Sequence, residues 1–483
     1  QTVFITKRNF EENRGTPKVI VAQEKLDCSH LLGKFVDSTH YDVLVEEDTD
    51  CYMVADCSVD ERSNCDKESC SSCDLPKARD EKRIAFVFRK NFFTQQEQED
   101  AYKGLREAAT ASNNRGLAAG PKIGGSDNRA FVTEEQMEIL HDLLQTTPAL
   151  DPDLRDNVDS IRAKWKGRDD NSSRGQVWLS ERTQLDGFEF EEWLSDVRLM
   201  QIDERSAEVK RAMDRYISNT TYANSVFSGI AGWYDRYPRI PYLRPTAYTQ
   251  HNFENFKLSF PFLQTLNEAF RHYLPWRWGN QNKAAKSLDS RYLVPETVFT
   301  TITVNKSFRT ALHLDAGDLD KGLSNLLVLS NNGNYKGGYL VFPEYRVAVN
   351  VRPGDLLLVN NHEIMHGNTP IELLDDIAER ISLVCYFREG MLNGGQKEYE
   401  DHRKAFVDLR RLNKDHKLWR EGWNGISPNM FSDNSNLDQE FGHAKEWYEY
   451  LKTLPEGGGW LKKYHPWLLD VFEPSSGLDE MFA

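Results

Sequence analysis

Residues 308–315 read FRTALHLD, and this stretch decides the fold and the chemistry that we expect. In a β-strand, residues two apart point to the same face, so His313 and Asp315 can offer an imidazole nitrogen and a carboxylate oxygen to one metal ion. A His-x-Asp pair is common by chance, and an ordinary core or surface histidine is the simplest explanation of His313 alone. The pair becomes informative only if the rest of the chain supplies a third ligand.

A third ligand follows in residues 354–370, GDLLLVNNHEIMHGNTP, just after another β-like run. Two histidines and one carboxylate on one face of iron leave three positions open, which is the ligand set of non-haem Fe(II) oxygenases. We expect His366 to be the third ligand, because it precedes the GNTP turn and lies 14 residues before Arg380. Arg380 opens a β-rich run, where its guanidinium can pair with the distal carboxylate of a 2-oxo diacid.

The same stretch leaves one competing interpretation and one ambiguity. Residues 362–366, HEIMH, match the His-Glu-x-x-His pattern of zinc peptidases, which requires both histidines on one face of a helix. Here the motif follows a β-like run and meets Gly367 and Pro370 directly afterwards, so we expect no helix. His362 nevertheless remains an alternative third ligand; otherwise it lies behind the ligands or at the surface.

Around these motifs, short β-rich runs separated by turns follow one another to about residue 390. No helix-length pattern lies between them, which indicates a sandwich or barrel rather than alternating βαβ units. The expected strands are residues 298–304, 325–329, 339–342, 347–351, 356–359 and 381–387.

The whole chain of 483 residues is long enough for two to four domains. We expect an acidic, Cys-rich N-terminal segment (1–80), a mainly helical region (81–244), the β-rich core (245–395) and a helical C-terminal region with an acidic tail (396–483). Helical periodicity is clearest in residues 133–144 and 195–216.

Two stretches resemble the TET/JBP dioxygenases, in particular the branch of J-binding proteins with phage and microbial relatives. They are residues 299–318, FTTITVNKSFRTALHLDAGD, and residues 337–343, GGYLVFP. The resemblance covers about residues 291–388. It implies an α+β fold in which helices flank a double-stranded β-helix (jelly-roll, cupin-like) oxygenase core.

The resemblance also implies the cofactors and the residues that hold them. Fe(II) would be bound by His313, Asp315 and His366, and 2-oxoglutarate by Arg380 with Ser382 as a helper. O₂ would be the oxidant, with ascorbate as a reductant that supports turnover.

By resemblance, the activity is hydroxylation of the 5-methyl group of a pyrimidine in DNA through a ferryl intermediate. The substrate would be 5-methylcytosine, giving 5-hydroxymethylcytosine, or thymine, giving 5-hydroxymethyluracil. A stacked base cannot reach iron inside a barrel, so the base must be flipped out. The alternatives are a prolyl or other protein hydroxylase on the same fold, and a binding module with a degenerate barrel, against which the intact ligand residues argue.

DNA is the expected partner, and we expect no protein partner and no membrane, since no apolar run approaches the length that spans a bilayer. The expected location is intracellular, in the nucleus or, for a viral protein, in the host cytoplasm. Taken alone, the net charge of −15 argues against DNA. However, residues 42–74 hold 11 acidic and two basic residues, and residues 431–483 hold ten acidic and four basic residues. These two segments together account for the whole net charge, so the rest of the chain is neutral. We expect both acidic segments to lie away from the DNA surface.

Several residues could contact DNA. Residues 235–245, DRYPRIPYLRP, interleave arginines with tyrosines; Arg239 and Tyr242 could contact a phosphate and a base, or could belong to a stiff linker packed on the core. Asn305 and Arg309 precede His313 on the same expected strand and could contact substrate, or Arg309 could form a salt bridge at the barrel mouth. The basic stretch 402–420 is better explained as a solvated helix face.

Six of the seven cysteines lie in the first 73 residues. A structural zinc ion could be bound there, although the spacing matches no standard knuckle; disulfides or free thiols are the alternatives. The candidate zinc ligands are Cys57, Cys65, Cys70 and Cys73. Cys385 lies in an expected core strand and should be a buried thiol.

Overall fold

The computed structural model describes most of the chain, apart from both ends and several internal stretches. The described residues are 8–54, 81–112, 115–120, 190–201, 205, 226–236, 240–412 and 437–473; for 190–193, 236, 240–241, 410–412 and 437–443 only the backbone is described. Residues 133–144 and most of 195–216, where helical periodicity is clearest in the sequence, lie outside these ranges.

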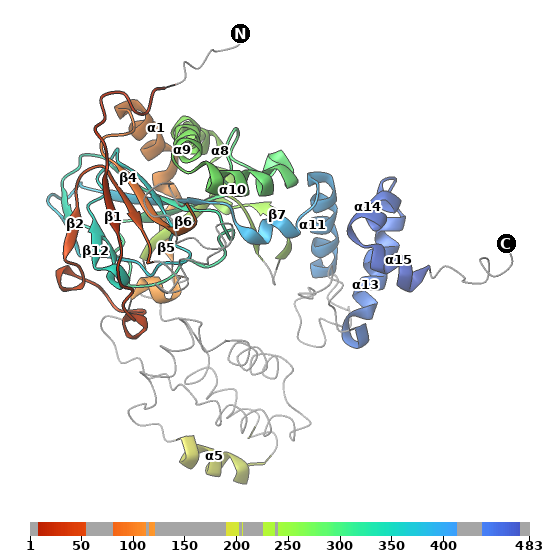
Figure 1. The fold of residues 1–483 in the computed structure, drawn as a ribbon. Helices are drawn as coiled ribbons and strands as arrows, with labels where there is room; N and C mark the ends of the chain where they lie inside the picture. Colours follow the sequence, from red (N-terminus) through yellow and green to blue (C-terminus); the bar gives the residue numbers. More distant parts are fainter. Residues whose placement is uncertain are drawn as a thin grey trace, which may run out of the picture.

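A ten-stranded sheet forms the centre of the molecule (Figure 1). Its strands are antiparallel except for the pair β1 and β3 at one edge. In spatial order they are β1 (Lys18–Val21), β3 (Thr49–Tyr52), β4 (Ile84–Arg89), β13 (Leu356–Val359), β9 (Ser324–Ser330), β16 (Arg380–Tyr386), β8 (Thr301–Lys306), β6 (Val226–Arg236) and β5 (Thr110–Ser112), with β7 (Ile240–Pro245) also paired to β6.

Two smaller sheets accompany this large sheet. One has four strands in the order β14 (Gly367–Asn368), β11 (Leu340–Phe342), β12 (Val347–Val349) and β2 (Val43–Val45), with β12 and β2 parallel. The other is the antiparallel pair of β10 (Tyr335–Gly337) and β15 (Ile371–Leu373).

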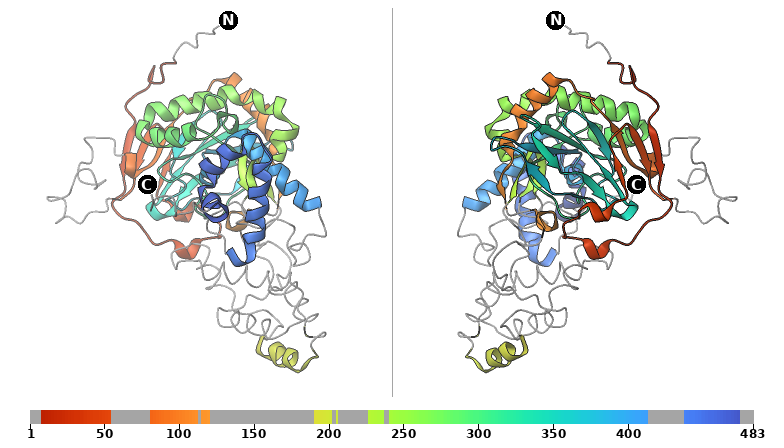
Figure 2. Two further views of the ribbon diagram at one scale, coloured as in Figure 1. Left: turned by 90° about the vertical axis from the view of Figure 1, so that its right-hand side faces the viewer. Right: turned by 90° about the vertical axis from the view of Figure 1, so that its left-hand side faces the viewer.

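Helices cover one side of the large sheet, and a separate helical group lies at the end of the molecule that holds β7 (Figures 1 and 2). The covering helices are α1 (Gln95–Leu105), α7 (Ala247–His251), α8 (Phe253–Leu258), α9 (Phe260–Tyr273) and α10 (Pro275–Ser287). The other described helices are α5 (Phe190–Leu199), α11 (Lys397–Leu412), α13 (Leu437–Lys452), α14 (Gly457–Tyr464) and α15 (Pro466–Phe472). Short 3-10 turns occur at Ser29–Leu31, Ser38–His40, Glu81–Arg83, Arg106–Ala108, Gly116–Ala119, Ser290–Tyr292, Pro343–Tyr345 and Glu389–Asn393.

The central strands of the large sheet, β4, β13, β9 and β16, are buried on both faces, which explains their continuous apolar runs. In β13, Leu356 and Leu358 pack toward helix α9, whereas Leu357 and Val359 pack toward the four-stranded sheet. The same alternation holds in β9. A strand with apolar residues at consecutive positions can fill two cores at once, because its side chains point alternately to opposite faces. The candidate site lies between the two sheets.

The structure differs from the sequence-based division of the chain in two respects. First, residues 247–287 are helical, although they fall within the region expected to be β-rich; in α9 the buried positions Leu263, Leu266, Phe270 and Tyr273 follow the three- and four-residue steps of a helix. Second, strands that precede residue 245 belong to the sheets. β4 pairs with β13, and β6 pairs with β8, so the sheet begins well before the expected boundary.

The stretch of chain between β5 and β6 leaves the large sheet and returns to it at neighbouring positions. These two strands are antiparallel neighbours, with Ser112 opposite Val226. Residues 113–225 are therefore enclosed between two positions that are paired across the ladder. Among the described residues, no helix combines the length and apolar content needed to cross a bilayer.

Candidate metal centre and co-substrate pocket

A backbone bridge brings two histidines together beside the four-stranded sheet. The amide of His313 donates to the carbonyl of His366, and the amide of His366 donates to the carbonyl of His313, each over 3.0 Å. The centroids of the two imidazole rings are 4.4 Å apart. The 53-residue gap between these histidines in the sequence is thus closed by an antiparallel contact, which the main chain holds independently of any ligand.

Both rings are oriented by carbonyl groups two residues earlier in the chain. Nδ1 of His313 lies 2.8 Å from the carbonyl of Ala311, and Nδ1 of His366 lies 3.0 Å from that of Ile364. A proton on Nδ1 of each ring would leave Nε2 free as a metal donor, an arrangement typical of ligating histidines.

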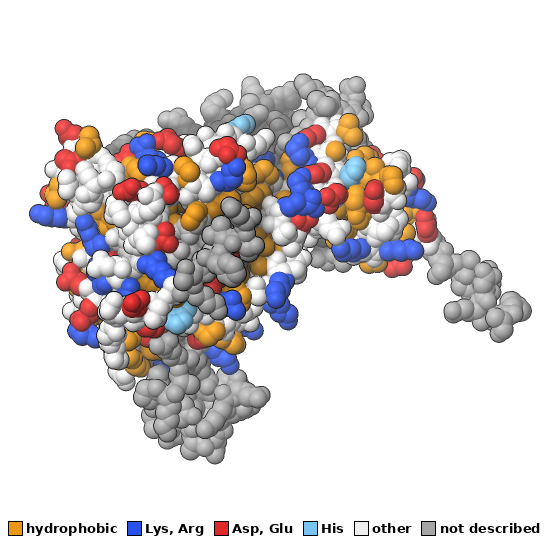
Figure 3. All heavy atoms as spheres, turned by 90° about the horizontal axis from the view of Figure 1, so that it is seen from above, with side chains coloured by type: hydrophobic (Ala, Val, Ile, Leu, Met, Phe, Trp, Pro, Cys, Tyr) orange, Lys and Arg blue, Asp and Glu red, His pale blue; other side chains and the backbone are white. Residues whose placement is uncertain are grey.

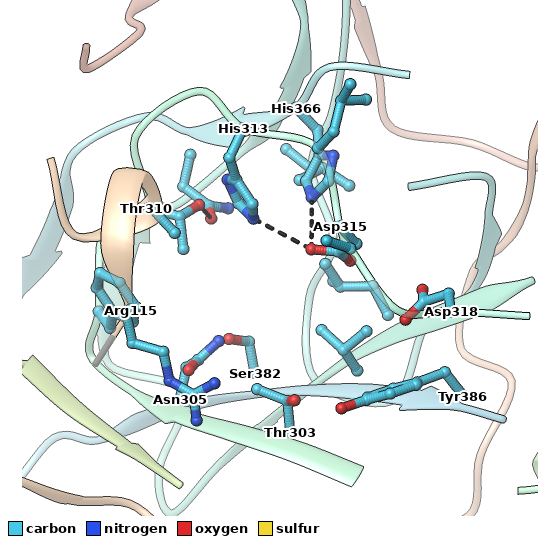
Figure 4. Close-up of a pocket in the computed structure, with 18 of the residues that line it drawn as sticks. Arg115, Thr303, Asn305, Thr310, His313, Asp315, Asp318, His366, Ser382 and Tyr386 are labelled. Atoms are coloured by element: carbon cyan, nitrogen blue, oxygen red, sulfur yellow. Dashed lines mark hydrogen bonds and ion pairs between the residues drawn. The ribbon is translucent and has the colours of Figure 1, made fainter. Parts of the chain in front are cut away.

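Asp315 completes the cluster (Figure 4). Its Oδ1 atom lies 3.2 Å from Nε2 of His313 and 3.7 Å from Nε2 of His366. One ligand atom from each of the three residues lies within 4.8 Å of the others. Two imidazole nitrogens and one carboxylate oxygen in this arrangement fit Fe(II) and leave open positions for other ligands.

The electrostatics of the cluster favour the protonation states that a metal requires. Burial, reinforced by nearby His313, lowers the pKa of His366 to about 4, so this ring is neutral near pH 7. Burial alone would raise the pKa of Asp315, but the neighbouring histidines outweigh it and hold that pKa below its usual value. A neutral imidazole and a charged carboxylate can bind metal without first losing protons.

His362 is not part of this cluster. Its Nδ1 atom lies 3.3 Å from the backbone carbonyl of Asp315, and the structure groups His366 instead with the other two donors. Residues 361–364 form a turn and a bend rather than a helix, so the HEIMH motif lacks the geometry that a zinc peptidase needs.

A cavity of about 230 Å³ opens beside the three donors. Its wall combines polar side chains from β8 and β16 with apolar side chains from β9, β11 and β16. The lining residues are Arg115, Ala118, Thr303, Asn305, Phe308, Thr310, His313, Leu314, Asp315, Ala316, Asp318, Leu326, Leu340, His366, Asn368, Ser382, Val384, Tyr386 and Arg388.

Arg380 is a buried cation two residues before the cavity-lining Ser382 on β16. Its side chain is almost fully buried, and Nη2 donates to the carbonyl of Gly338 over 3.1 Å. Within the described part of the chain it forms no ion pair with a carboxylate, and its buried Nε has no hydrogen-bond partner. Burial accordingly lowers the pKa of its guanidinium. A buried cation without a counter-charge is costly unless a ligand supplies one, so this position suits an anionic carboxylate such as that of 2-oxoglutarate.

Gly338 allows this close approach. Its φ is +70°, in the left-handed region, and a Cβ atom there would lie 2.9 Å from Nε of Arg380. Glycine therefore serves two needs at this position, the backbone conformation and the space for the guanidinium.

Some residues that line the cavity were not singled out from the sequence. Thr303 precedes Asn305 by two on β8, and Tyr386 follows Ser382 by four on β16, so strand alternation could have identified both. Asp318 is buried, and burial together with the charge of Asp315 raises its pKa well above the usual value. Arg115 comes from a distant segment that carries no signal in the sequence.

Of the expected substrate contacts, Asn305 lies in the cavity wall and accepts a hydrogen bond from Ser228. Arg309 does not line the cavity: Nη2 donates to the carbonyl of Val36 over 2.8 Å, and its guanidinium stacks on Phe35. The reason is local. Ser307 has a φ of 44°, which ends the alternation of β8 and turns Arg309 away from the face that we expected it to share with His313.

The remaining candidates are placed elsewhere or not described. Tyr242 is buried in a cluster with Tyr399 and Trp447, so its expected contact with DNA is replaced by packing between β7 and the C-terminal helices. Arg239 lies outside the described residues, as do the candidate zinc ligands Cys57, Cys65, Cys70 and Cys73. Cys28, Cys51 and Cys385 are buried free thiols.

The described surface shows charges of both signs. Lys, Arg, Asp and Glu side chains are interspersed on the face shown in Figure 3. Two of the described acids of the N-terminal acidic segment are paired with arginines: Asp42 with Arg346, and Asp50 with Arg89, each over 2.8 Å. None of residues 42–54 lines the cavity, whereas the rest of that segment lies outside the described residues.

The donor cluster and the adjoining cavity define a class of site, that of mononuclear non-haem iron oxygenases. Comparison with known proteins agrees with this class. Residues 230–389 match the Tet_JBP family model, described as the oxygenase domain of the 2OGFeDO superfamily. This part of the chain is similar to the oxygenase domain of the TET/JBP family.

Known relatives match this chain over only a small part of their own length. The thymine dioxygenase JBP1 of Leishmania braziliensis is 34% identical over 185 residues, which cover 37% of this chain and 22% of that protein. The bifunctional helicase and thymine dioxygenase JBP2 of Trypanosoma brucei brucei is 36% identical over 171 residues, which cover 34% and 15%. The matched stretch is thus less than a quarter of either relative. The match to a solved structure titled NgTET1 in complex with 5mC DNA covers 81% of this chain and 91% of that chain at 13% identity, with a TM-score of 0.36.

Proposed function

We propose that this protein is an Fe(II)- and 2-oxoglutarate-dependent dioxygenase that hydroxylates the 5-methyl group of a pyrimidine in DNA. The observation that carries the proposal is the cluster of His313, Asp315 and His366 on a cavity within the segment that matches the TET/JBP oxygenase domain. The reaction would convert thymine to 5-hydroxymethyluracil or 5-methylcytosine to 5-hydroxymethylcytosine. The name thymine dioxygenase, which the matching relatives carry, supports this substrate class.

The proposed fold of the core is a double-stranded β-helix. Along the chain, β8 and β9 belong to the large sheet, β11 and β12 to the four-stranded sheet, β13 to the large sheet, β14 to the four-stranded sheet and β16 to the large sheet. Between β8 and β9, the amide of Asn368 in β14 donates to the carbonyl of Thr310, and His313 bridges to His366, which adds a short edge to the four-stranded sheet. This alternation between facing sheets is what a jelly-roll requires.

When bound, Fe(II) and 2-oxoglutarate supply the oxidising chemistry, in which O₂ is consumed and succinate and CO₂ are released. His313, Asp315 and His366 hold the metal, and Arg380 with Ser382 orients the distal carboxylate. The apolar wall contributed by Leu326, Leu340 and Val384 limits the access of water.

The substrate must enter as a flipped nucleotide. The three donors lie between two sheets, and His366 is only 3% exposed, so a base stacked in a duplex cannot present its methyl group to the metal. DNA is accordingly the proposed partner, and an intracellular location goes with that substrate.

Product analysis tests the proposal directly. The purified protein is incubated with Fe(II), 2-oxoglutarate, ascorbate and DNA that contains thymine or 5-methylcytosine, and the digested nucleosides are analysed by mass spectrometry. We expect a 5-hydroxymethyl nucleoside, which Asp315→Ala should abolish and the matched exposed variant Asp320→Ala should retain. Succinate released only with a peptide substrate would instead identify a protein hydroxylase on the same fold and overturn the proposal.

A further inference from the structure

A cluster of polar and charged side chains surrounds Glu379, the residue directly before Arg380. The carboxylate of Glu379 accepts hydrogen bonds from Nε and Nη2 of Arg106 over 3.0 and 2.7 Å, and from the hydroxyl of Tyr102 over 2.5 Å. It also pairs with Nζ of Lys306 over 2.7 Å. These contacts, chiefly the one with Arg106, lower the pKa of Glu379 to about 2, so the carboxylate is charged at neutral pH. One carboxylate thus joins the end of α1, the end of β8 and the start of β16.

The side chains of Glu379 and Arg380 point to opposite faces of the large sheet, because the two residues are consecutive in extended chain. Glu379 reaches Arg106 on the side of α1, whereas Arg380 donates to the carbonyl of Gly338 on the side of the cavity. The backbone holds the same place, since the amide of Ser307 donates to the carbonyl of Arg380 over 2.7 Å. The start of β16 is therefore fixed on one face by the Glu379 cluster and along its edge by the end of β8.

The guanidinium of Arg380 depends on this backbone position. Within the described part of the chain, its Nη2 donates to the carbonyl of Gly338, and its Nε has no hydrogen-bond partner. Its centre lies 5.8 Å from the centroid of the Tyr335 ring. Contacts of this kind leave the strand itself to decide where the cation lies. A shift of the strand by about 1 Å would take a charge-assisted hydrogen bond to a ligand out of its best range.

We propose that Glu379 is a positioning residue for Arg380. Its ion pairs with Arg106 and Lys306 hold the start of β16, so that the guanidinium of Arg380 meets the distal carboxylate of the 2-oxo acid. This inference rests on the proposed function. Arg106 lies outside residues 230–389, which match the family model. A part of the chain beyond the matched domain therefore contributes to the affinity for the co-substrate without touching it.

The cluster is partly exposed to water, which limits its contribution to the stability of the fold. The side chains of Glu379, Lys306 and Arg106 are 16%, 30% and 34% exposed. Ion pairs in such positions contribute little to stability, because water and salt screen their charges. We therefore expect the cluster to control the local geometry of β16 more than the free energy of unfolding.

Two 2-oxo acids separate the positioning of Arg380 from a general effect on the site. 2-Oxopentanoate lacks the distal carboxylate of 2-oxoglutarate and so has no group for Arg380. Binding of both acids to the full chain loaded with Fe(II) is measured by anaerobic calorimetry. Glu379→Gln should weaken 2-oxoglutarate by about three- to tenfold and leave 2-oxopentanoate unchanged. The control Glu254→Gln, which removes the carboxylate of an ion pair with Lys257 in α8, should bind both acids as the unaltered protein does.

A double-mutant cycle tests whether Glu379 acts through Arg380. Arg380→Gln alone should weaken 2-oxoglutarate, and Glu379→Gln added to it should cause no further loss, because no guanidinium remains to be positioned. Arg106→Gln should reproduce the pattern of Glu379→Gln, and Arg106→Lys, which keeps the charge, should restore part of the affinity. Equal losses from Glu379→Gln with and without Arg380 would show that the two residues act independently and would overturn the inference.

Thermal unfolding without Fe(II) or 2-oxo acid shows whether each variant is folded. If Glu379→Gln does not fold, Arg106→Gln provides the same test, because it leaves the carboxylate paired with Lys306. Unchanged binding of 2-oxoglutarate by the folded variants, or equal weakening of both acids, contradicts a positioning role and leaves the proposed function intact. If the unaltered protein binds neither acid, the proposed function fails and the inference fails with it.

Discussion

The donor atoms of the candidate metal centre are aimed by the main chain. Each histidine ring is fixed by a carbonyl two residues earlier, and the two histidines bridge each other through their amides. His362, four residues before His366, has no such connection to the other donors and reaches only the backbone of Asp315. The difference between these two histidines can therefore be tested by substitution.

His366→Ala should eliminate stoichiometric iron binding, because it removes one of three donors and leaves the remaining pair without a complete face. His362→Ala should retain the metal and change its affinity by at most about tenfold, as expected for a residue that supports a ligand from behind. Metal content after anaerobic reconstitution and gel filtration measures both. Iron lost from His362→Ala and retained by His366→Ala would reverse the assignment.

Gly338→Ala should weaken the binding of 2-oxoglutarate and lower the stability of the fold. The added Cβ would lie 2.9 Å from Nε of Arg380, and the left-handed backbone adds strain of about 1–2 kcal/mol. The matched control is Gly279→Ala in helix α10, where a Cβ meets nothing within 4 Å and should stabilise the helix by up to about 1 kcal/mol. Calorimetry for the ligand and urea unfolding for stability check both effects. If Gly338→Ala binds 2-oxoglutarate with unchanged affinity, Arg380 does not contact the co-substrate.

Among the elements, the C-terminal helices contain a buried polar group that is sensitive to acid. His465, between α14 and α15, is 2% exposed, and its Nε2 accepts hydrogen bonds from the hydroxyl of Tyr399 and from Nε1 of Trp447. Burial, with a smaller contribution from Arg403, lowers the pKa of His465 from 6.5 to about 3. The folded protein thus holds this ring neutral where an unfolded chain would protonate it.

Acid should therefore destabilise the fold through His465. Its contribution is fully present above pH 6.5 and is lost as the pH falls toward 3, with a slope of up to about 1.4 kcal/mol per pH unit, because the unfolded state binds the proton first. Urea unfolding between pH 7 and pH 4 should show a shallower loss of stability in His465→Gln. The control His402→Gln, which alters a partly exposed histidine paired with Tyr450, should keep the original slope. Equal slopes in all three proteins would contradict this account.

The sequence predicted the strands of the core better than the helices beside them. Leu356–Val359 and residues 381–387 were recognised because turns bound short apolar runs. The sequence-based division places helix α9 in the β-rich core because the helix adjoins that stretch, although its apolar spacing is helical. Strand β4 was missed because its partner β13 lies more than 250 residues later in the chain, and no local pattern reports such a pairing.

For the whole molecule, the sheets depend on strands from outside the oxygenase match. β4 supplies Phe86 and Phe88 to the core between the sheets, and β2 extends the four-stranded sheet beside β12. A fragment of residues 226–412 should therefore show no cooperative thermal transition, whereas the full chain should unfold cooperatively. Circular dichroism and calorimetry compare the two. A fragment that unfolds cooperatively would show that these N-terminal strands are dispensable.

The sequence predicts the metal donors and two residues of the cavity wall, Asn305 and Ser382, but neither the position of Arg309 nor the presence of Arg115. His313, Asp315 and His366 follow from spacing and turn residues, and the structure brings them together. Arg309 was misplaced because one left-handed residue, Ser307, reverses the alternation on which the prediction relied. Arg115 could not be predicted, because its position depends on a hydrogen bond between segments nearly 200 residues apart.

The pairing of Ser112 with Val226 has a consequence for how this protein can change in length. The stretch between them starts and finishes at adjacent rungs of one ladder, so the remainder of the sheet is closed whatever its length. A change of length between Gly120 and Phe190 therefore leaves the register of β5 and β6 unaltered, while the turn Gly116–Ala119 is held by its hydrogen bond to Ala311. Among the described strands, β5 and β6 thus flank a place where the chain can change in length beside the cavity that Arg115 lines.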